Sequence, residues 1–287
     1  MIARSRRLGA SRRLNRVSGG QQASARSEST RAAAWARSLV PRGWRHLLFQ
    51  FALLGSFEIV YALSGIYGRR ANGTALANAH GLLRLEGSLG LDWEHGIQDW
   101  ALRAPHVFLD IANRTYFISQ FTISTVFLLW VYARRQEHFA RVRNALLAAN
   151  YVSVIVMFLY PLAPPRAIPG AGFVDTLDAN AVNLHSPLIT ALNNPNSAMP
   201  SLHASYAIVL GITGFLVTKN IVVRTLWTLY PLLVSYSVIA TGNHYVLDIV
   251  AGGAALAATP IVDRAAAWLA TRQTGRAGWL TVERETT

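Results

Sequence analysis

The sequence contains no cysteine, and only 14% of its 287 residues are charged. The absence of cysteine excludes disulfides, thiolate catalysis and cysteine metal sites. Soluble domains usually carry about 25% charged residues. The low charge, together with 52% hydrophobic residues and a mean hydropathy of +0.27, therefore indicates a membrane protein.

Acidic residues are also scarce, so the net charge is +13. The basic residues are almost all Arg, and they cluster beside apolar segments. Attraction to anionic lipid and control of membrane topology explain such clusters. We therefore expect the bilayer as a partner and no nucleic acid.

Six segments approach the roughly 20 apolar residues that a helix needs to cross a bilayer. Hydrocarbon offers no partner to free backbone groups, so each span is expected to be helical. The sequence thus predicts an all-α, polytopic bundle whose membrane domain covers residues 47–269. The expected spans are Leu47–Tyr67, Ile111–Tyr132, Ala145–Tyr160, Leu202–Val217, Ile221–Ala240 and Tyr245–Val262, the last with an extension toward Leu269.

Charge also predicts the orientation of the bundle. Residues 1–46 hold eleven Arg and one acid, which is typical of a disordered basic tail. With the tail 1–46 and the tail 270–287 in the cytoplasm, 21 of the 27 basic residues lie on the cytoplasmic side. The bias of Arg over Lys suggests a GC-rich bacterium, and so a bacterial plasma membrane.

Two long segments then lie outside the cytoplasm. Residues 68–110 mix apolar and acidic residues and are expected to form amphipathic helices on the membrane surface. Residues 161–201 are rich in Pro, Asn and Gly, and an irregular loop of that length is usually functional. We expect the 161–201 loop to border an active site.

The last span opens with His244 and Asp248, which are four residues apart and share a helix face. A carboxylate that accepts a hydrogen bond from one imidazole nitrogen leaves the other nitrogen as a nucleophile. By itself, such a pair is more often a structural contact between helices. Catalysis by His244 is therefore a hypothesis that needs further support.

That support comes from two other spans. His203 lies at the start of the fourth span, after Ser201, where free N–H groups and the helix dipole favour an anion. Arg166 follows the prolines that end the third span, and a guanidinium suits bidentate contact with phosphate. The topology brings these groups to the same membrane face as His244, and ionisable groups at such depth are usually functional.

These residues resemble motifs of the type 2 phosphatidic acid phosphatase (PAP2) superfamily. Pro200-Ser201-Leu202-His203 is similar to its second motif, usually Pro-Ser-Gly-His, and His244 with Asp248 matches its third. Pro164-Pro165-Arg166 resembles the end of the first motif. The Pro-Ser-Leu-His form is closer to the inositol phosphorylceramide synthase branch. The resemblance covers roughly residues 110–262.

The resemblance implies a metal-independent reaction without a cofactor. His244 attacks phosphorus and forms a phosphohistidine, while Asp248 orients His244. His203 protonates the leaving oxygen and then activates water or an acceptor alcohol. Arg166 and N–H groups near Ser201 stabilise the phosphoryl oxygens. The expected substrate is a lipid phosphate or phospholipid.

Two phosphate-binding cations of the family pattern are missing. Leu159 stands at the Lys position of the first motif, and Val238 stands at the Arg position of the third, after Ser237. Arg114, near the outer end of the second span, is a candidate substitute. Without a substitute, an inactive relative is an alternative.

Other functions remain open at this point. Transfer of a phosphoinositol-like headgroup is the leading hypothesis, and a polyprenyl or glycerolipid phosphate phosphatase is its alternative. A transporter would place polar residues around a cavity in the middle of the membrane. An intramembrane hydrolase would use Ser201 or Ser205, although no Gly-x-Ser-x-Gly motif is present.

Overall fold

The computed structural model describes residues 40–177 and 194–269. Within these ranges helices are joined by turns and irregular segments, and Leu162 and Ser197 form an isolated β-bridge. The predicted tails, apart from residues 40–46, and residues 178–193 of the 161–201 loop lie outside the described residues. The elements are α2 (Trp44–Arg70), α3 (Asn72–Leu89), α4 (Glu94–Arg103), α5 (His106–Ile118), the π-helix η1 (Ser119–Ile123), α6 (Ser124–Arg134), α7 (Gln136–Leu159), the 3-10 turn η2 (Pro165–Ala167), α9 (Leu202–Val217), α10 (Ile221–Ala240), α11 (Val246–Ala255) and the 3-10 turn η4 (Leu256–Ala258).

The expected all-α membrane bundle is confirmed. Five helical segments are long and apolar enough to cross a membrane, and the apolar α9, with 16 residues, is the sixth. The second span begins at His106 and includes the π-helix, so it is longer than predicted. The last span continues from α11 through η4 to Leu269, as the predicted extension required.

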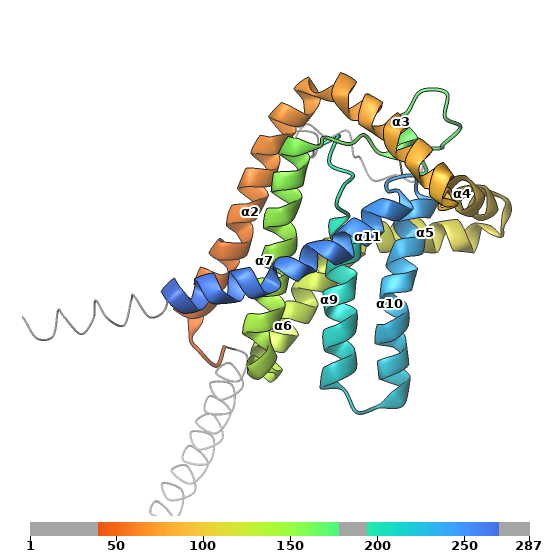
Figure 1. Ribbon diagram of the computed structural model, residues 1–287. Helices are drawn as coiled ribbons and strands as arrows, with labels where there is room; N and C mark the ends of the chain where they lie inside the picture. Colours follow the sequence, from red (N-terminus) through yellow and green to blue (C-terminus); the bar gives the residue numbers. More distant parts are fainter. Residues whose placement is uncertain (1–39, 178–193, 270–287) are drawn as a thin grey trace, which may run out of the picture.

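Small residues allow α9 and α10 to pack closely, and the two helices lie side by side (Figure 1). A Cβ at Gly211 would lie 2.8 Å from the carbonyl oxygen of Trp227, and a Cβ at Gly214 would overlap the Trp227 ring. Small residues at helix interfaces are typical of membrane proteins, in which close packing replaces hydrophobic association. The Asn220 side chain caps α10 by accepting the Val223 N–H at 3.2 Å.

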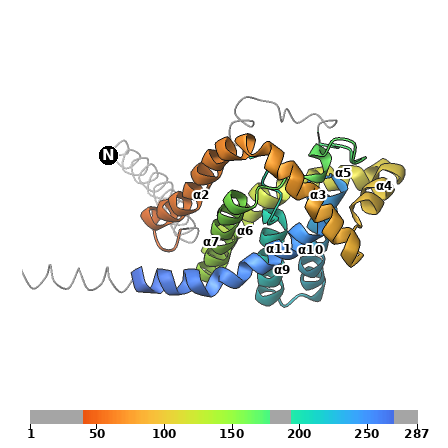
Figure 2. The same cartoon turned by 45° about the horizontal axis from the view of Figure 1, so that its top comes forward.

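The helix α11 is inclined to α9 and crosses it closely (Figures 1 and 2). A Cβ at Gly252 would lie 2.5 Å from the Ser201 carbonyl oxygen, so the crossing requires glycine. The Ser205 hydroxyl donates to the carbonyl oxygens of Ser201 at 3.0 Å and Gly252 at 2.8 Å. These contacts hold the first turn of α9 against the second turn of α11, and the Ser201 N–H, which donates to the Asp248 carbonyl oxygen at 3.0 Å, joins it to the first turn.

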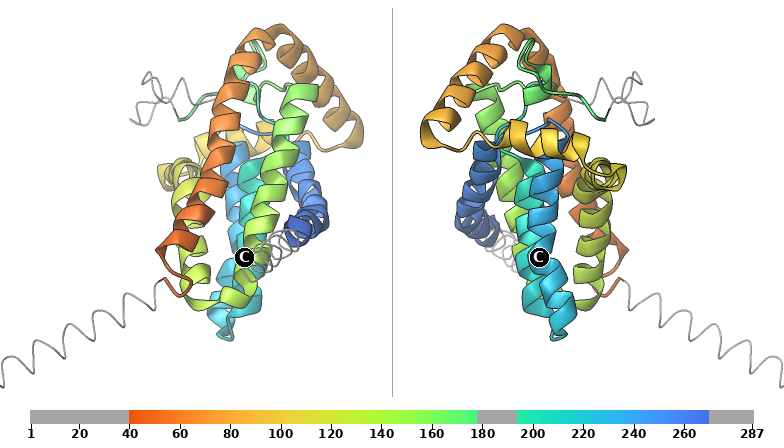
Figure 3. Two further views of the ribbon diagram at one scale, coloured as in Figure 1. Left: turned by 90° about the vertical axis from the view of Figure 1, so that its left-hand side faces the viewer. Right: turned by 90° about the vertical axis from the view of Figure 1, so that its right-hand side faces the viewer.

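The helices α3 and α4 cross one end of the bundle (Figure 3). The prediction of helices in residues 68–110 agrees with the structure, but both helices bury a carboxylate: Glu86 is 0% exposed and Glu94 is 1% exposed. Ala75, Ala79 and Leu82 of α3 are also buried. These two helices therefore pack against the bundle as part of its core.

The opposite end of the bundle holds the basic turns. Asn144 at the start of α7 donates to Asp263 at 2.6 Å, and Arg143 donates to Gln50 of α2 at 2.9 Å. These bonds bring the beginning of α2 and the end of the last span to the same end of the molecule (Figure 1). The basic turns after α6 and α9 lie at this end too.

Candidate active site

The two histidines singled out from the sequence lie together. His203 is in the first turn of α9, and His244 lies just before α11. Their ring centroids are 5.8 Å apart, and both rings line a cavity of about 80 Å³ at the end of the bundle that α3 and α4 cover. Because the first turns of α9 and α11 are held side by side, residues 41 positions apart in the sequence meet at one site.

His244 is held in one tautomer. Its Nδ1 lies 2.8 Å from the Ala198 carbonyl oxygen and 3.3 Å from Oδ2 of Asp248. A carbonyl oxygen only accepts hydrogen bonds, so Nδ1 carries the proton and Nε2 keeps its lone pair. Burial lowers the pKa of His244 to about 4, so the imidazole is neutral near pH 7. This is the form that a nucleophile requires.

His203 is placed by Tyr116 of α5. Its ring stacks on the Tyr116 ring at 4.4 Å, and its Nε2 lies 3.2 Å from the Tyr116 carbonyl oxygen. The carbonyl again requires a proton on that nitrogen, which leaves the Nδ1 lone pair free to accept one. His203 can therefore take up and release a proton at Nδ1.

Arg166 completes the predicted group. The Arg166 N–H donates to the Gly242 carbonyl oxygen at 3.0 Å, and its Nε donates to Oδ1 of Asn243 at 2.9 Å. Gly242 has a φ of +68°, and a Cβ there would lie 3.2 Å from the Cβ of Arg166. Asp175 lies 3.3 Å from Nη1 and offsets part of the charge. The guanidinium is thus fixed at the wall of the cavity.

Ser201 has a different role from the one predicted. Its side chain is fully buried and caps α9 by accepting the Ala204 N–H at 3.4 Å. Its own N–H donates to the Asp248 carbonyl oxygen at 3.0 Å and so cannot bind phosphate. Leu202 and His203 line the cavity, and their N–H groups form no hydrogen bond within residues 40–177 and 194–269. Within the described chain, the N–H groups of Leu202 and His203 are therefore free donors in the first turn of α9.

Arg114 does not lie with the other candidates. It is exposed on α5, whereas Tyr116 and Gln120, further along the same span, line the cavity. A helix turns by about 100° per residue, so a position two residues before Tyr116 faces nearly the opposite side. The prediction used the depth of Arg114 in the membrane, which does not determine the face on which a side chain lies.

Carboxyl groups bind the backbone N–H groups in the first turn of α11, and two of them come from residues 68–110, which were expected to form helices on the membrane surface. Glu94 accepts the Val246 N–H and Glu86 accepts the Leu247 N–H, each at 2.7 Å. Asp248 accepts the preceding N–H, that of Tyr245, at 3.0 Å. Three consecutive N–H groups beside His244 are thus bound by three carboxyl groups. Such contacts stabilise a helix N-terminus by satisfying its free donors and its dipole.

Glu86 has an unusual protonation state for a carboxyl group. Its Oε2 is buried and has no hydrogen-bond partner in the described part of the chain. Burial raises the pKa of Glu86 to about 8; the Leu247 hydrogen bond lowers this pKa, and the nearby carboxyl groups of Glu94 and Asp248 raise it further. Glu86 therefore keeps a proton near pH 7, which limits repulsion within the cluster.

A family model described as PAP2 superfamily matches residues 80–262, and this range contains both histidines, Asp248 and Arg166. The chain belongs to the PAP2 superfamily. This membership, with the helical membrane bundle, supports a membrane lipid phosphatase as the broad function. Among solved structures, the crystal structure of Aquifex aeolicus LpxE is similar in part. It has 16% identity and a TM-score of 0.44, over 61% of this chain and 94% of that chain. No curated protein matches the sequence.

The two residues that depart from the PAP2 motifs, Leu159 and Val238, both lie away from the cavity. Leu159, at the motif's Lys position, is 79% exposed at the end of α7. Val238, at the Arg position, is fully buried and packs against Ala207 and Ile239. Neither residue lines the cavity, and Arg166 is the sole cationic side chain among the described residues that do.

Proposed function

We propose that this PAP2 protein transfers a phosphoryl-linked headgroup of a membrane lipid through a phosphohistidine on His244. The observation that carries this proposal is the fixed tautomer of His244. Its protonated Nδ1 contacts Ala198 and Asp248, so the Nε2 lone pair is the reactive group beside His203. The reaction requires no second nucleophile from the protein.

The reaction has two balanced steps. In the first, Nε2 of His244 attacks phosphorus, the bond from phosphorus to the lipid oxygen breaks, and a protonated His203 gives that oxygen its proton. In the second, the acceptor oxygen attacks phosphorus, the N–P bond breaks, and the acceptor proton passes to His203. Arg166 and the N–H groups of Leu202 and His203 stabilise the charge on the phosphoryl oxygens.

The positive charge of the site favours a phosphodiester as the donor. A phosphodiester carries one negative charge, whereas a phosphomonoester carries about 1.5 to 2 near pH 7. The cavity offers one guanidinium, partly offset by Asp175, and one helix N-terminus worth roughly half a charge. This balance supports transfer of an inositol phosphate-like headgroup to an alcohol, in keeping with the Pro-Ser-Leu-His form of the second motif.

Hydrolysis of a polyprenyl or glycerolipid phosphate is the second candidate, because the superfamily membership favours a phosphatase. The two candidates use the same histidines and differ in the donor charge and in the acceptor. A transporter is less well supported, since the polar groups gather at one end of the bundle. A serine hydrolase is also less well supported, since Ser205 is buried with its hydroxyl committed to two carbonyl oxygens.

We also propose that the site faces away from the cytoplasm of a bacterial plasma membrane, with both termini in the cytoplasm. The support is the distribution of charge: the Arg-rich turns lie at the end of the bundle opposite the histidines. The positive-inside rule assigns that end to the cytoplasm. Accessibility of a cysteine introduced at exposed Arg135 to a membrane-impermeant thiol reagent, in intact and in broken cells, tests this orientation.

The activity is tested with purified protein in detergent and EDTA. Phosphatidylinositol, phosphatidic acid and a polyprenyl phosphate serve as donors, with and without an acceptor alcohol. We expect headgroup transfer that is lost in His244→Ala and kept in His138→Ala, a histidine at the other end of the bundle. Labelled donor should leave an acid-labile phosphoryl group on the wild type only. Activity that survives His244→Ala would refute the phosphohistidine, and free phosphate as the sole product would favour the phosphatase.

A further inference from the structure

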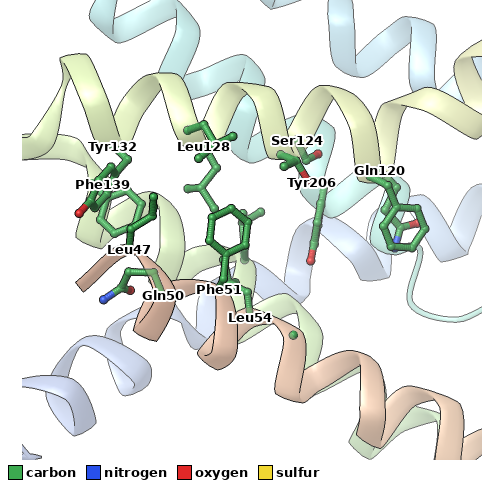
Figure 4. Close-up of a pocket in the computed structure, with 15 residues that line it drawn as sticks. Leu47, Gln50, Phe51, Leu54, Gln120, Ser124, Leu128, Tyr132, Phe139 and Tyr206 are labelled. Carbon is green, nitrogen blue, oxygen red and sulfur yellow. The ribbon is translucent and has the colours of Figure 1, made fainter. Parts of the chain in front are cut away.

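A second, apolar cavity lies next to the histidine cavity and shares a wall with it. It has a volume of about 210 Å³ and runs between α2 and the η1–α6 part of the second span. Gln120 lines both cavities. Figure 4 shows side chains of α2, such as Phe51 and Leu54, opposite Leu128 and Ser124 across this groove, with Gln120 at one end and Tyr132 at the other.

The same helices build both cavities. Tyr61 of α2 and Tyr116 of α5 line the histidine cavity, and later turns of the second span line the groove. Gln120 lies in the π-helix η1, which changes the direction of side chains between α5 and α6. A π-bulge in a helix is rare and is found most often at functional sites. It occurs here at the point where the two cavities meet.

We propose that the groove binds one hydrocarbon chain of the lipid whose phosphorus lies at His244. The inference rests on the proposed function and adds the position of the lipid tail. The groove is lined mainly by apolar side chains inside spans that cross the membrane. Phe51 and Phe121, at its sides, are 46% and 59% exposed, so the groove opens toward the surrounding hydrocarbon. A lipid can therefore reach it sideways from the bilayer.

The length of the groove suits a lipid chain. From Gln120 to Tyr132 the span advances twelve residues, or about 18 Å at about 1.5 Å per residue. Because Tyr132 lies next to the basic turn after α6, the groove runs from the histidine cavity toward the opposite end of the bundle and offers a long apolar path for a hydrocarbon chain. Polar groups close the far end: the Tyr132 hydroxyl lies 3.1 Å from Nδ1 of His46, and Gln50 accepts from Arg143. A chain would end there.

Two substitutions fill the groove from opposite walls. A Cβ at Gly55 of α2 meets nothing within 4 Å, so Gly55→Phe places a ring in the groove without backbone strain. Thr125→Phe does the same from α6. Ser56→Phe is the matched control, because Ser56 is exposed on α2 and does not line the groove. None of these positions lines the histidine cavity.

The test compares phosphatidylinositol and phosphatidic acid with either two hexanoyl or two palmitoyl chains. We expect both groove-filling variants to lower kcat/KM for the palmitoyl donor by at least about tenfold, the effect of unburying about two methylene groups. The hexanoyl donor should change by less than about twofold. Ser56→Phe should leave both donors unchanged. Equal losses on both chain lengths, or no loss on either, would overturn the proposal.

A binding measurement separates this inference from the proposed function. Dipalmitoyl phosphatidic acid should raise the Tm of the wild type and of His244→Ala in detergent, and should raise that of Gly55→Phe much less. Absence of turnover with the binding difference intact would refute the proposed reaction and keep the groove. Equal shifts in Tm for wild type, Gly55→Phe and Thr125→Phe would show general detergent-like binding and would refute the groove.

Discussion

The carboxyl groups at the first turn of α11 give the sharpest prediction, because they act on His244 from helices far away in the sequence. Glu94→Ala removes a charge-assisted hydrogen bond of 2.7 Å to the Val246 N–H. Hydrogen bonds to charged groups contribute about 1.5–3 kcal/mol, and the buried N–H loses its partner as well. We expect a lower thermal midpoint in detergent and a loss in kcat of about a hundredfold, the order of effect of a 1 Å displacement of a reacting group.

The ionisation of Glu86 predicts a particular dependence of stability and activity on pH. Folding raises its pKa from 4.5 to about 8. The associated stabilisation is complete below about pH 4.5 and is lost as the pH rises through about 8, when the carboxylate charges beside Glu94 and Asp248. The tyrosines Tyr245 and Tyr160 also face this cluster. We therefore expect the thermal midpoint to fall between about pH 4.5 and 8 and then to level off, and activity to fall as the pH rises through about 8.

The Glu86→Gln variant distinguishes the effect of the Glu86 charge from the effect of its hydrogen bond to Leu247. The amide oxygen still accepts the Leu247 N–H but cannot ionise, so this variant should keep most of its activity and lose the decline above about pH 8. Asp99→Asn on α4 is the control, because Asp99 pairs with exposed Arg103 and should not alter the profile. The assay is kcat against pH on a soluble short-chain donor. An identical alkaline decline in the wild type and in Glu86→Gln would refute this reasoning.

Three further changes have definite expected results. Arg166→Lys should lower kcat/KM about tenfold to a hundredfold, because an ammonium group cannot both bind Asn243 and present a planar fork to phosphate. Steady-state kinetics on the best donor would check this. Unchanged kinetics would argue against contact between Arg166 and phosphate. Gly242→Ala should cost about 1–2 kcal/mol through its φ of +68°, seen as a lower thermal midpoint, and an unchanged midpoint would contradict that strain. Ser205→Ala should lower the thermal midpoint through loss of its bond to Gly252 and leave the short-chain kcat within about threefold, whereas a complete loss with a folded protein would revive the serine hydrolase.

Much of the fold and part of the site could be predicted from local sequence features. Apolar runs of spanning length define the helices without reference to the rest of the chain. The separation of His244 and Asp248 by four residues predicts their contact, and the structure has it at 3.3 Å. The prolines before Arg166 predicted the end of the third span, and α7 ends at Leu159. Each of these signals lies within a few residues.

The rest depended on contacts between distant residues. Glu86 and Glu94 bind N–H groups 161 and 152 positions away, and nothing near them in the sequence distinguishes a capping carboxylate from a surface one. Arg114 was predicted from its depth in the membrane alone. The side of α5 on which it lies depends on how α5 packs, and it is the side away from the cavity. The π-helix that places Gln120 between the two cavities has no local sequence signal either.

The proposed phosphate binding with few cations depends on the two helix N-termini at the site. Both helices direct their positive dipole end toward the same region. At α11 the donors are taken by Glu86, Glu94 and Asp248, so an anion is repelled there and His244 is held in place. At α9 the N–H groups of Leu202 and His203 remain open to the cavity. In the proposed reaction the phosphoryl group is attracted to α9 while His244 approaches from α11, and the absence of cations at positions 159 and 238 suits a donor with a single negative charge.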